Sequence, residues 1–288
     1  MPNKTRDTMS RIWCPDKSYR MVQIVISTAL IISALSVVDA APKKNNGPTV
    51  LPLPSYVPRA CSRNDPNVTE CVKRVGTLAI QGVVKGDPKY RIPRLDPMLI
   101  EELKVQQGTK QVGLSIICKK CLLYGLPTTE FIQADVDWDK KSCTWGFHVN
   151  EINVKGKYNV SGQVLLLPIT GSGNAEFNLY DINFKYIYEW EENKIANWTY
   201  INVTKSEFPL EVKNMTIKLE NLFNGDKLLG ENMNRFINDN WAVILKDIKP
   251  ALSEALASLT TSVLTNMAKV VPFDLMFPEK YDPKAPLP

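Results

Sequence analysis

The sequence predicts an α+β fold in which a highly curved antiparallel sheet wraps around a long C-terminal α-helix and encloses a hydrophobic tunnel. Two patterns carry this prediction. Apolar residues alternate with period two between Val112 and Leu219, and they recur at helical spacing from about Lys227 to Val270. A helix of that length spans roughly 60 Å at about 1.5 Å per residue. Such a rod is too long for a compact packing, so the sheet must curve along it.

The composition of the 288 residues is that of a globular protein, with 44% hydrophobic and 23% charged residues. It excludes a disordered chain and a many-pass membrane protein. The net charge of +5, from 35 basic and 30 acidic residues, is too weak to indicate a nucleic-acid partner. His148 is the single histidine, so a multi-histidine metal site is impossible. We therefore expect no metal and no cofactor.

The first 40 residues are typical of a secretory signal peptide, which predicts an extracellular protein. A basic segment precedes the apolar run Met21–Val38, and Val38-Asp39-Ala40 offers small residues for cleavage. The alternative is a signal anchor, because 18 residues approach the length that spans a bilayer. Met21 is also a candidate alternative start.

Residues 41–60 are rich in Pro, Lys and Asn and are expected to form an extended lead-in. A helix is then predicted up to about Val84, with Asp65 or Asn67 as its cap. Its apolar face recurs at helical spacing, and a loop rich in Gly and Pro is expected to follow it through Pro97.

Five N-x-[ST] sequons follow the signal segment and agree with export. Their asparagines are Asn67, Asn159, Asn197, Asn202 and Asn214. Three of these side chains have outward parity in their predicted strands, as a glycosylated residue must.

The cysteines also fit an oxidising compartment. Cys61 and Cys71 close a short loop and are predicted to form a disulfide. Cys118-Lys-Lys-Cys121 invites a redox or zinc interpretation, but there is no second C-x-x-C and the motif lies in a strand. We expect one of Cys118 and Cys121 to pair with Cys143, and the sequence does not decide which.

The C-terminal segment is predicted to be one helix from about Lys227 to Val270, entered through the turn Asn224-Gly225-Asp226. Pro250 removes a backbone donor and should kink this helix without ending it. A proline-rich tail is expected from Pro272.

The chain resembles the haemolymph juvenile-hormone-binding and Takeout family of arthropod secreted proteins, from about Cys61 to Phe277. The order and spacing of several short motifs carry the resemblance. They are Leu95-Asp96-Pro97, Tyr124-Gly125-Leu126, Tyr158-x-x-x-Gly162-x-x-Leu165-Leu166-Leu167-Pro168-Ile169-x-Gly171-x-Gly173, Leu219-Glu220-Asn221-Leu222-Phe223-Asn224-Gly225-Asp226-x-x-Leu229-Gly230, Asn238-x-Asn240-Trp241 and Val271-Pro272-Phe273-Asp274.

This resemblance implies one domain over residues 61–277, followed by a proline-rich tail over 278–288. It implies carriage of a small apolar ligand, such as a terpenoid hormone, a fatty acid or a related lipid. The pair Cys61–Cys71 fits the family pattern, whereas Cys118, Cys121 and Cys143 depart from it.

Large apolar residues at inward positions are candidates for the wall of the tunnel, and each could equally be plain core. They are Trp145, Phe147, Phe177, Phe184, Tyr186, Trp241, Leu252, Leu256 and Leu259.

No catalytic constellation is present in the sequence. Gly171-Ser172-Gly173 lacks the spacing of a nucleophile elbow, and His148 has outward strand parity. Asp135, Asp137 and Asp139 could hold calcium, but a solvated strand edge is the preferred interpretation.

We therefore expect a secreted, monomeric, glycosylated carrier without catalysis, and transient contact with a membrane or receptor is compatible with it. Its rivals are a membrane-acting or lipid-surface-binding defence protein, a secreted lipid esterase that uses His148, and a structural or signalling glycoprotein with a filled core.

Overall fold

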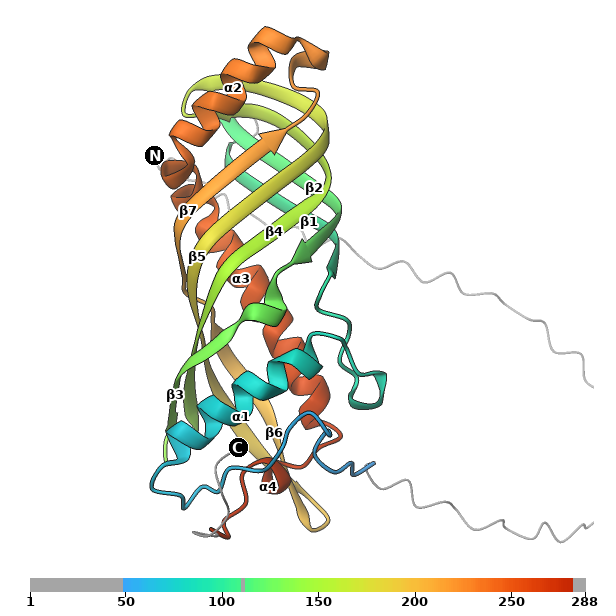
Figure 1. Cartoon of the computed structure of the whole chain (residues 1–288), viewed down its shortest axis with the longest axis vertical. Helices are drawn as coiled ribbons and strands as arrows, with labels where there is room; N and C mark the ends of the chain where they lie inside the picture. Colours follow the sequence, from blue (N-terminus) through green and yellow to red (C-terminus); the bar gives the residue numbers. More distant parts are fainter. Residues whose placement is uncertain (1–48, 110–111, 282–288) are drawn as a thin grey trace, which may run out of the picture. The chain divides into compact units, whose positions relative to one another are not determined.

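Two long antiparallel strands, β4 (Ser142–Val164) and β5 (Leu167–Ile195), form the centre of the computed structural model in Figure 1. The structure describes residues 49–109 and 112–281, and they all belong to one unit, Asn46–Pro288. The predicted signal peptide, residues 1–40, lies outside the described residues.

The remaining strands add to this central pair in one seven-stranded antiparallel sheet. The order is β1-β2-β4-β5-β6, while β3 pairs with β4 and β7 pairs with β5. On its other edge, β4 pairs first with β3 and then with β2. The other edge of β5 pairs first with β7 and then with β6. The added strands are β1 (Met98–Thr109), β2 (Val112–Tyr124), β3 (Glu130–Asp137), β6 (Trp198–Glu207) and β7 (Leu210–Leu219). The predicted sheet is confirmed.

Strand β1 precedes the predicted start of the sheet at Val112. It pairs with β2 in a constant register from Met98 to Thr109, and the pair Glu101–Lys120 is missing from it. This irregularity breaks the alternation of β1, and Ile100 and Leu103 both face inward although they are three residues apart. The alternation of apolar residues therefore did not identify β1 from the sequence.

The predicted first helix is confirmed as α1 (Val68–Val83), which packs against β3. The Asp65 carboxylate accepts a 2.8 Å bond from the backbone N–H of Asn67, while the Asn67 side chain makes no capping bond. Short 3-10 turns, η1 (Pro88–Tyr90), η2 (Leu126–Thr128) and η3 (Phe223–Gly225), connect the larger elements.

The prediction of one helix from Lys227 to Val270 is wrong, because Asn240 divides it. The structure has α2 (Lys227–Asp239) and α3 (Trp241–Ala268), and Pro250 lies inside α3. Asn240 leaves helical geometry at φ −114° and ψ 16°, and its side-chain N–H donates to the Phe236 carbonyl at 2.8 Å. This bond satisfies a carbonyl in the last turn of α2, so the break is a specific feature of the sequence.

The curved sheet wraps one side of α3, while α2 lies across one end of the strands (Figure 1). Two large apolar clusters lie between the sheet and the helices. The α2 cluster contains Tyr158, Met215, Leu222, Met233 and Ile237. The aromatic cluster surrounds the C-terminal half of α3 and contains Tyr186, Tyr188, Trp190, Phe208 and Phe273.

The cysteine prediction is wrong for three residues. A disulfide joins Cys61 to Cys71, a second joins Cys118 to Cys121, and Cys143 is free and buried. Residues three apart on a regular strand are about 10 Å apart, too far for a disulfide. A bulge brings the Cα atoms of Cys118 and Cys121 to 6.2 Å, because two residues of β2 oppose one residue of β4.

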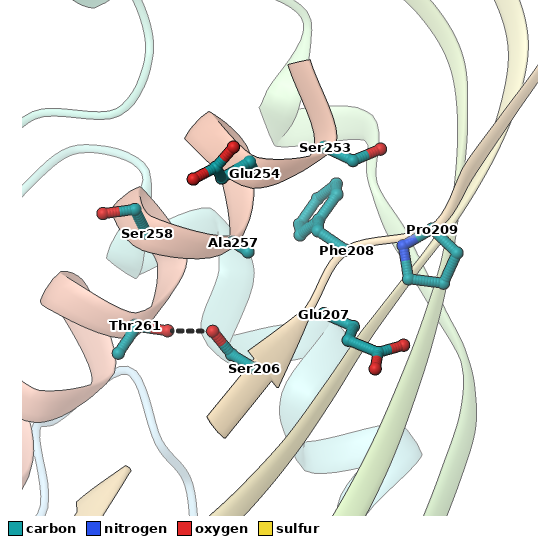
Figure 2. Close-up of a pocket in the computed structure, with 9 residues that line it drawn as sticks. All are labelled: Ser206, Glu207, Phe208, Pro209, Ser253, Glu254, Ala257, Ser258 and Thr261. Atoms are coloured by element: carbon teal, nitrogen blue, oxygen red, sulfur yellow. Dashed lines mark hydrogen bonds between the residues drawn. The ribbon is translucent and has the colours of Figure 1, made fainter. Parts of the chain in front are cut away.

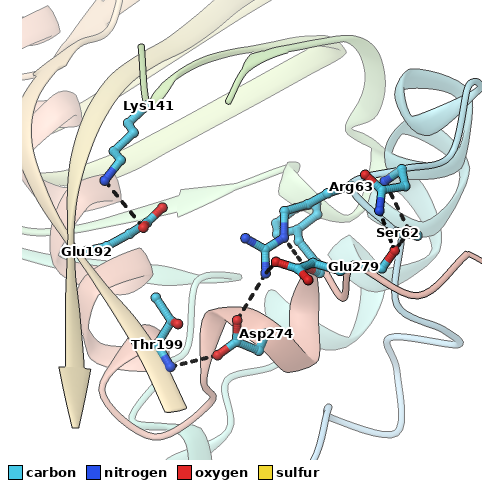
Figure 3. A network of polar contacts seen from close by, with 9 residues as sticks. Ser62, Arg63, Lys141, Glu192, Thr199, Asp274 and Glu279 are labelled. Carbon is cyan, nitrogen blue, oxygen red and sulfur yellow. Dashed lines mark hydrogen bonds and ion pairs between the residues drawn. The ribbon is translucent and has the colours of Figure 1, made fainter. Parts of the chain in front are cut away.

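The N-terminal segment is fastened to the C-terminal one by a set of contacts that we call the terminal clamp (Figure 3). Arg63 pairs with Asp274 at 3.0 Å and donates to the Phe277 carbonyl at 2.8 Å. The second oxygen of Asp274 accepts a 2.7 Å bond from the backbone N–H of Thr199 in β6. Asp274 belongs to α4 (Phe273–Met276), so the segment expected to be a plain proline-rich tail contains a short helix in which Phe273 is buried.

Candidate ligand-binding cavity

An apolar cavity of about 230 Å³ lies between the sheet and α3. Its wall includes side chains from β1, β2, β4, β5, β7 and α3, and Phe208 closes part of it from the β6–β7 connection. The lining residues are Ile100, Leu103, Ile116, Cys118, Leu123, Leu126, Val149, Ile152, Val154, Phe177, Leu179, Ile182, Phe184, Phe208, Leu210, Met215, Leu245, Ile248, Leu252 and Leu256.

Helix α3 forms one wall because four of its apolar residues share a stripe. Leu245, Ile248, Leu252 and Leu256 recur every three or four residues, which places them on one side of an α-helix. On the sheet, Ile152 and Val154 in β4 and Phe177 and Leu179 in β5 are each two residues apart and share the inner face.

The lining contains no charged side chain and no hydroxyl or amide side chain. Water inside such a space lacks hydrogen-bond partners, whereas an apolar molecule loses nothing by entering. The chemistry of the cavity therefore selects an apolar ligand or the apolar part of a larger one.

The structure places four of the predicted tunnel residues in the cavity wall and five elsewhere. Phe177, Phe184, Leu252 and Leu256 line the cavity. Leu259 is 41% exposed and does not line the cavity, although its spacing from Leu256 continues the stripe of α3. The other predicted residues are not part of this lining and pack in the apolar clusters beside it.

Trp145, Phe147 and Tyr186 extend the aromatic cluster from the cavity toward α1. Phe147 stacks on Phe184 at a centroid distance of 5.0 Å, and Trp145 meets Phe131 and Tyr186. The Tyr186 side chain is fully buried, and its hydroxyl lies 2.7 Å from Thr261 Oγ1 in α3. Trp241 packs against the α2 cluster, at the start of α3. These residues support the cavity from its ends.

The wall residues of β1 and β2 were missed by the sequence reasoning. Ile100 and Leu103 lie in the strand that the sequence did not reveal, and Ile116 is one apolar residue within a run of them. The available signal was alternation in β2, where Leu114, Ile116 and Cys118 point the same way.

The disulfide Cys118–Cys121 is part of the same region, because Cys118 lines the cavity. Gly156 in β4 lies opposite the bulge that the disulfide closes. A Cβ atom at Gly156 would lie 2.7 Å from the Cα atom of Cys121, so only glycine leaves room for the bulge at this position.

The outer face of the sheet holds polar groups that do not reach the cavity. His148 Nε2 lies 3.1 Å from an oxygen of Asp181, which also pairs with Lys213. The bonds to Lys213 and His148 hold the pKa of Asp181 below its ordinary value. His148 alternates with Val149, which lines the cavity, so the imidazole is on the other face. In the described residues, no serine or cysteine is hydrogen-bonded to His148.

The acidic run at the end of β3 is a solvated edge in the structure. Asp137 pairs with Lys140 at 3.0 Å, and hydrogen bonds from Lys140 lower the pKa of Asp137. Within residues 49–109 and 112–281, no group of three or more His, Cys, Asp or Glu side chains could hold a metal ion.

All five sequon asparagines are exposed. Asn159 lies between the buried residues Tyr158 and Val160, and Asn214 precedes the buried Met215, so both point outward as their parity predicts. Over the part of the chain that the structure describes, no helix is both long and apolar enough to span a membrane.

The comparisons with known proteins agree with this architecture. Residues 32–278 match the family model described as haemolymph juvenile hormone binding protein. The chain is 23% identical to the circadian clock-controlled protein daywake of Drosophila melanogaster over 72% of this chain and 83% of that protein. The daywake protein of Drosophila yakuba is 22% identical over the same shares.

A crystal structure of Takeout 1 from Epiphyas postvittana superposes with a TM-score of 0.69 and 26% identity, over 76% of this chain and 99% of that one. The curved sheet, the long helix and the family match over most of the sequence lead to one conclusion: the chain belongs to the haemolymph juvenile hormone binding protein family.

Proposed function

We propose that the protein is an extracellular carrier that binds a small hydrophobic ligand, such as a terpenoid hormone, a fatty acid or a related lipid, without transforming it. The cavity between the sheet and α3 carries this proposal, because its lining is apolar throughout. The family match supports the same class of ligand.

Burial of the ligand supplies enough free energy for such a role. Each CH₂ group moved from water into an apolar site gains about 0.8 kcal/mol. A ligand with ten buried methylene groups therefore gains about 8 kcal/mol before the costs of ordering it. A net gain of that size would correspond to a Kd of about 1 μM, so the ordering costs leave such a ligand weaker than that, and tighter binding requires more buried carbon atoms.

The surface chemistry supports export. Two disulfides are typical of an oxidising compartment, and five exposed sequons are available for glycosylation. We propose a monomer of one domain over residues 61–277, which follows the cleaved signal peptide and the lead-in.

Catalysis is not part of the proposal, because His148 lies on the face of the sheet opposite the cavity. A lipid esterase would hydrolyse esters, and His148→Ala would abolish that activity. A membrane-acting defence protein would instead associate with vesicles of anionic phospholipid. Ester hydrolysis that depends on His148 would favour the esterase over the carrier. Association with anionic vesicles would favour the membrane-acting protein.

The direct test is native mass spectrometry of the secreted, deglycosylated protein, followed by organic extraction and identification of bound lipid. We expect a stoichiometric apolar adduct, or binding of at least one member of a panel of terpenoids and fatty acids. If neither is observed, the protein is not a carrier and the filled-core alternative takes its place.

A matched pair of variants on α3 tests the location of the ligand. Ile248→Trp fills the cavity and should weaken ligand binding by at least about tenfold, because it occupies the space of several methylene groups. Val243→Trp adds the same ring at an exposed site of the same helix and should leave affinity unchanged. If the two substitutions change ligand affinity equally, the ligand binds outside this cavity. Thermal unfolding of both variants checks that they are folded.

A further inference from the structure

A second space, an open groove of about 680 Å³ with both apolar and polar lining residues, lies beside α3 on the side of the β6–β7 connection (Figure 2). Its apolar lining comes from Phe208, Pro209 and Ala257. Its polar lining comes from Ser206, Glu207, Ser253, Glu254, Ser258 and Thr261. We call this space the head-group groove.

Phe208 lines both the head-group groove and the apolar cavity. Its ring is 9% exposed and stacks on Phe184 of the cavity wall, with a centroid distance of 5.1 Å and an interplanar angle of 13°. On α3, Leu252 and Leu256 line the cavity, while Ser253 and Ala257, each one residue later, line the groove. One aromatic ring and one helix edge therefore separate the two spaces.

The polar lining of the groove carries negative charge and no positive charge. Glu207 and Glu254 are both exposed, and no lysine or arginine is among the lining residues. Within the described parts of the chain, neither carboxylate has an ion-pair partner. Their potential is therefore available to a bound group, and it favours a cation over an anion.

The hydroxyl groups of the groove differ in their roles. Thr261 Oγ1 is 2.9 Å from Ser206 Oγ and 2.7 Å from the Tyr186 hydroxyl, so these three groups bond one another and tie α3 to the sheet. Ser253 and Ser258 have no partner of this kind among the described residues. Both hydroxyl groups can therefore donate a hydrogen bond to a ligand or accept one from it.

The sizes of the two spaces are complementary. The apolar cavity, at about 230 Å³, is smaller than the usual ligand pocket of about 300–1,000 Å³. A longer amphiphile would therefore place only its chain in the cavity. The neighbouring groove offers the space for its polar end, once the Phe208 ring turns aside.

We propose that the head-group groove holds the polar end of an amphiphilic ligand, that Phe208 closes the passage to the cavity, and that the preferred head is an alcohol or an amine and not a free carboxylate. This inference rests on the proposed carrier function and specifies its ligand class. Glu207 and Glu254 accept hydrogen bonds from such a head, whereas they repel a carboxylate.

Three probes with the same twelve-carbon chain test the preference for the head: dodecylamine, dodecan-1-ol and dodecanoate. Their affinities for the full secreted protein are measured at pH 7 and low salt, below their aggregation concentrations. We expect dodecylamine to bind at least about fivefold tighter than dodecanoate, with a ratio that falls as salt rises. Dodecan-1-ol should bind between them.

The double variant Glu207→Lys/Glu254→Lys should reverse the order of amine and carboxylate. Glu231→Lys makes the same change at an exposed glutamate of α2 that lies outside the groove, and it should leave the order intact. If the wild type binds dodecanoate as tightly as dodecylamine, or if Glu231→Lys reverses the order as well, the inference is wrong and the carrier function stands. If none of the three probes and no terpenoid binds, the carrier function itself fails.

The role of Phe208 is tested by the kinetics of dodecylamine binding. Phe208→Leu and Phe208→Ala should raise both the association and the dissociation rate, because the passage is less obstructed. Phe177→Leu shortens a cavity side chain that does not line the groove and should mainly raise the dissociation rate. Unchanged association rates in both Phe208 variants would show that the ligand enters by another route.

Discussion

The side-chain amide of Asn238 in α2 hydrogen-bonds both backbone groups of Ile217 in β7, the N–H at 2.8 Å and the C=O at 2.7 Å. Asn234, one turn earlier, makes the same pair of bonds with Leu219, both at 2.9 Å. Strand β7 pairs only with β5, so its other edge would otherwise present free backbone groups. The two asparagines satisfy that edge as a neighbouring strand would, and they fix α2 to the sheet.

Asn238→Ala should lower the free energy of unfolding by about 1–3 kcal/mol, because it leaves a buried N–H and a C=O without partners. Asn232→Ala removes an exposed asparagine from the same helix and should change stability by under about 0.5 kcal/mol. Urea denaturation of the two variants measures the difference. Similar values for both would show that water satisfies the strand edge equally well.

The β4–β5 turn is occupied by two leucines in left-handed backbone geometry. Leu165 and Leu166 have φ of 48° and 75°, and Leu166 is 84% exposed. A two-residue hairpin with both φ angles positive favours Asn-Gly. The double variant Leu165→Asn/Leu166→Gly should therefore raise the free energy of unfolding by about 1 kcal/mol or more. Its melting temperature, measured by calorimetry, should rise.

The control for this turn is Leu228→Gln, which makes an exposed leucine of α2 polar without changing a turn. It should leave the melting temperature close to that of the wild type. If it raises the temperature as much as the turn variant does, surface hydrophobicity and not backbone geometry is the cause.

The free thiol of Cys143 should be unreactive in the folded protein. Burial raises its pKa to about 12, so at pH 8 the thiol stays protonated, and the thiolate is the reactive form. Iodoacetamide at pH 8 should label Cys143 only after denaturation without a reductant, and peptide mapping identifies the labelled residue. Labelling of Cys118 or Cys121 under these conditions would contradict the disulfide between them.

Stability should fall at alkaline pH partly through Tyr158. Its hydroxyl donates to the Glu220 backbone carbonyl at 2.7 Å, and burial, with the Glu220 charge, raises its pKa from 10.0 to about 12. The folded state favours the protonated phenol, so this contribution is complete below pH 10 and is lost as pH rises through 12.

Tyr158→Phe removes this titration, so its free energy of unfolding should drop less between pH 8 and pH 11 than that of the wild type. Urea denaturation at both pH values measures the two drops. Tyr124→Phe, at an exposed tyrosine, should leave the wild-type drop unchanged. An equal drop in the wild type and Tyr158→Phe would exclude Tyr158 as a source of alkaline sensitivity.

The regular parts of the fold could be predicted because local patterns dominate there. Apolar residues at alternate positions, Met215, Ile217 and Leu219, identified β7. Apolar residues at helical spacing identified α1. Pro250 does not end the helix, as predicted, because α3 continues through it to Ala268. The break at Asn240 involves the local bond from its side chain to the Phe236 carbonyl, which the spacing of apolar residues does not reveal.

The candidate site was partly predictable for a similar reason. Leu252 and Leu256 follow from the stripe of α3, and Phe177 and Phe184 from β5. The contribution of β1 could not be predicted, because its inward residues Ile100 and Leu103 are three positions apart and break the two-residue alternation. The pairing of Cys118 with Cys121 required a bulge, which shortens a distance that a regular strand would keep too long.

The terminal clamp has a consequence for the biosynthesis of the chain. Arg63 emerges from the ribosome 211 residues before Asp274. At about 5–20 residues per second this interval lasts roughly 10–40 s. The Cys61–Cys71 loop can close early because it is local, whereas Arg63 has to wait for the last elements of the chain. A chain that ends before Asp274 therefore lacks the residues that bind Arg63, and its N-terminal segment cannot be attached in this way.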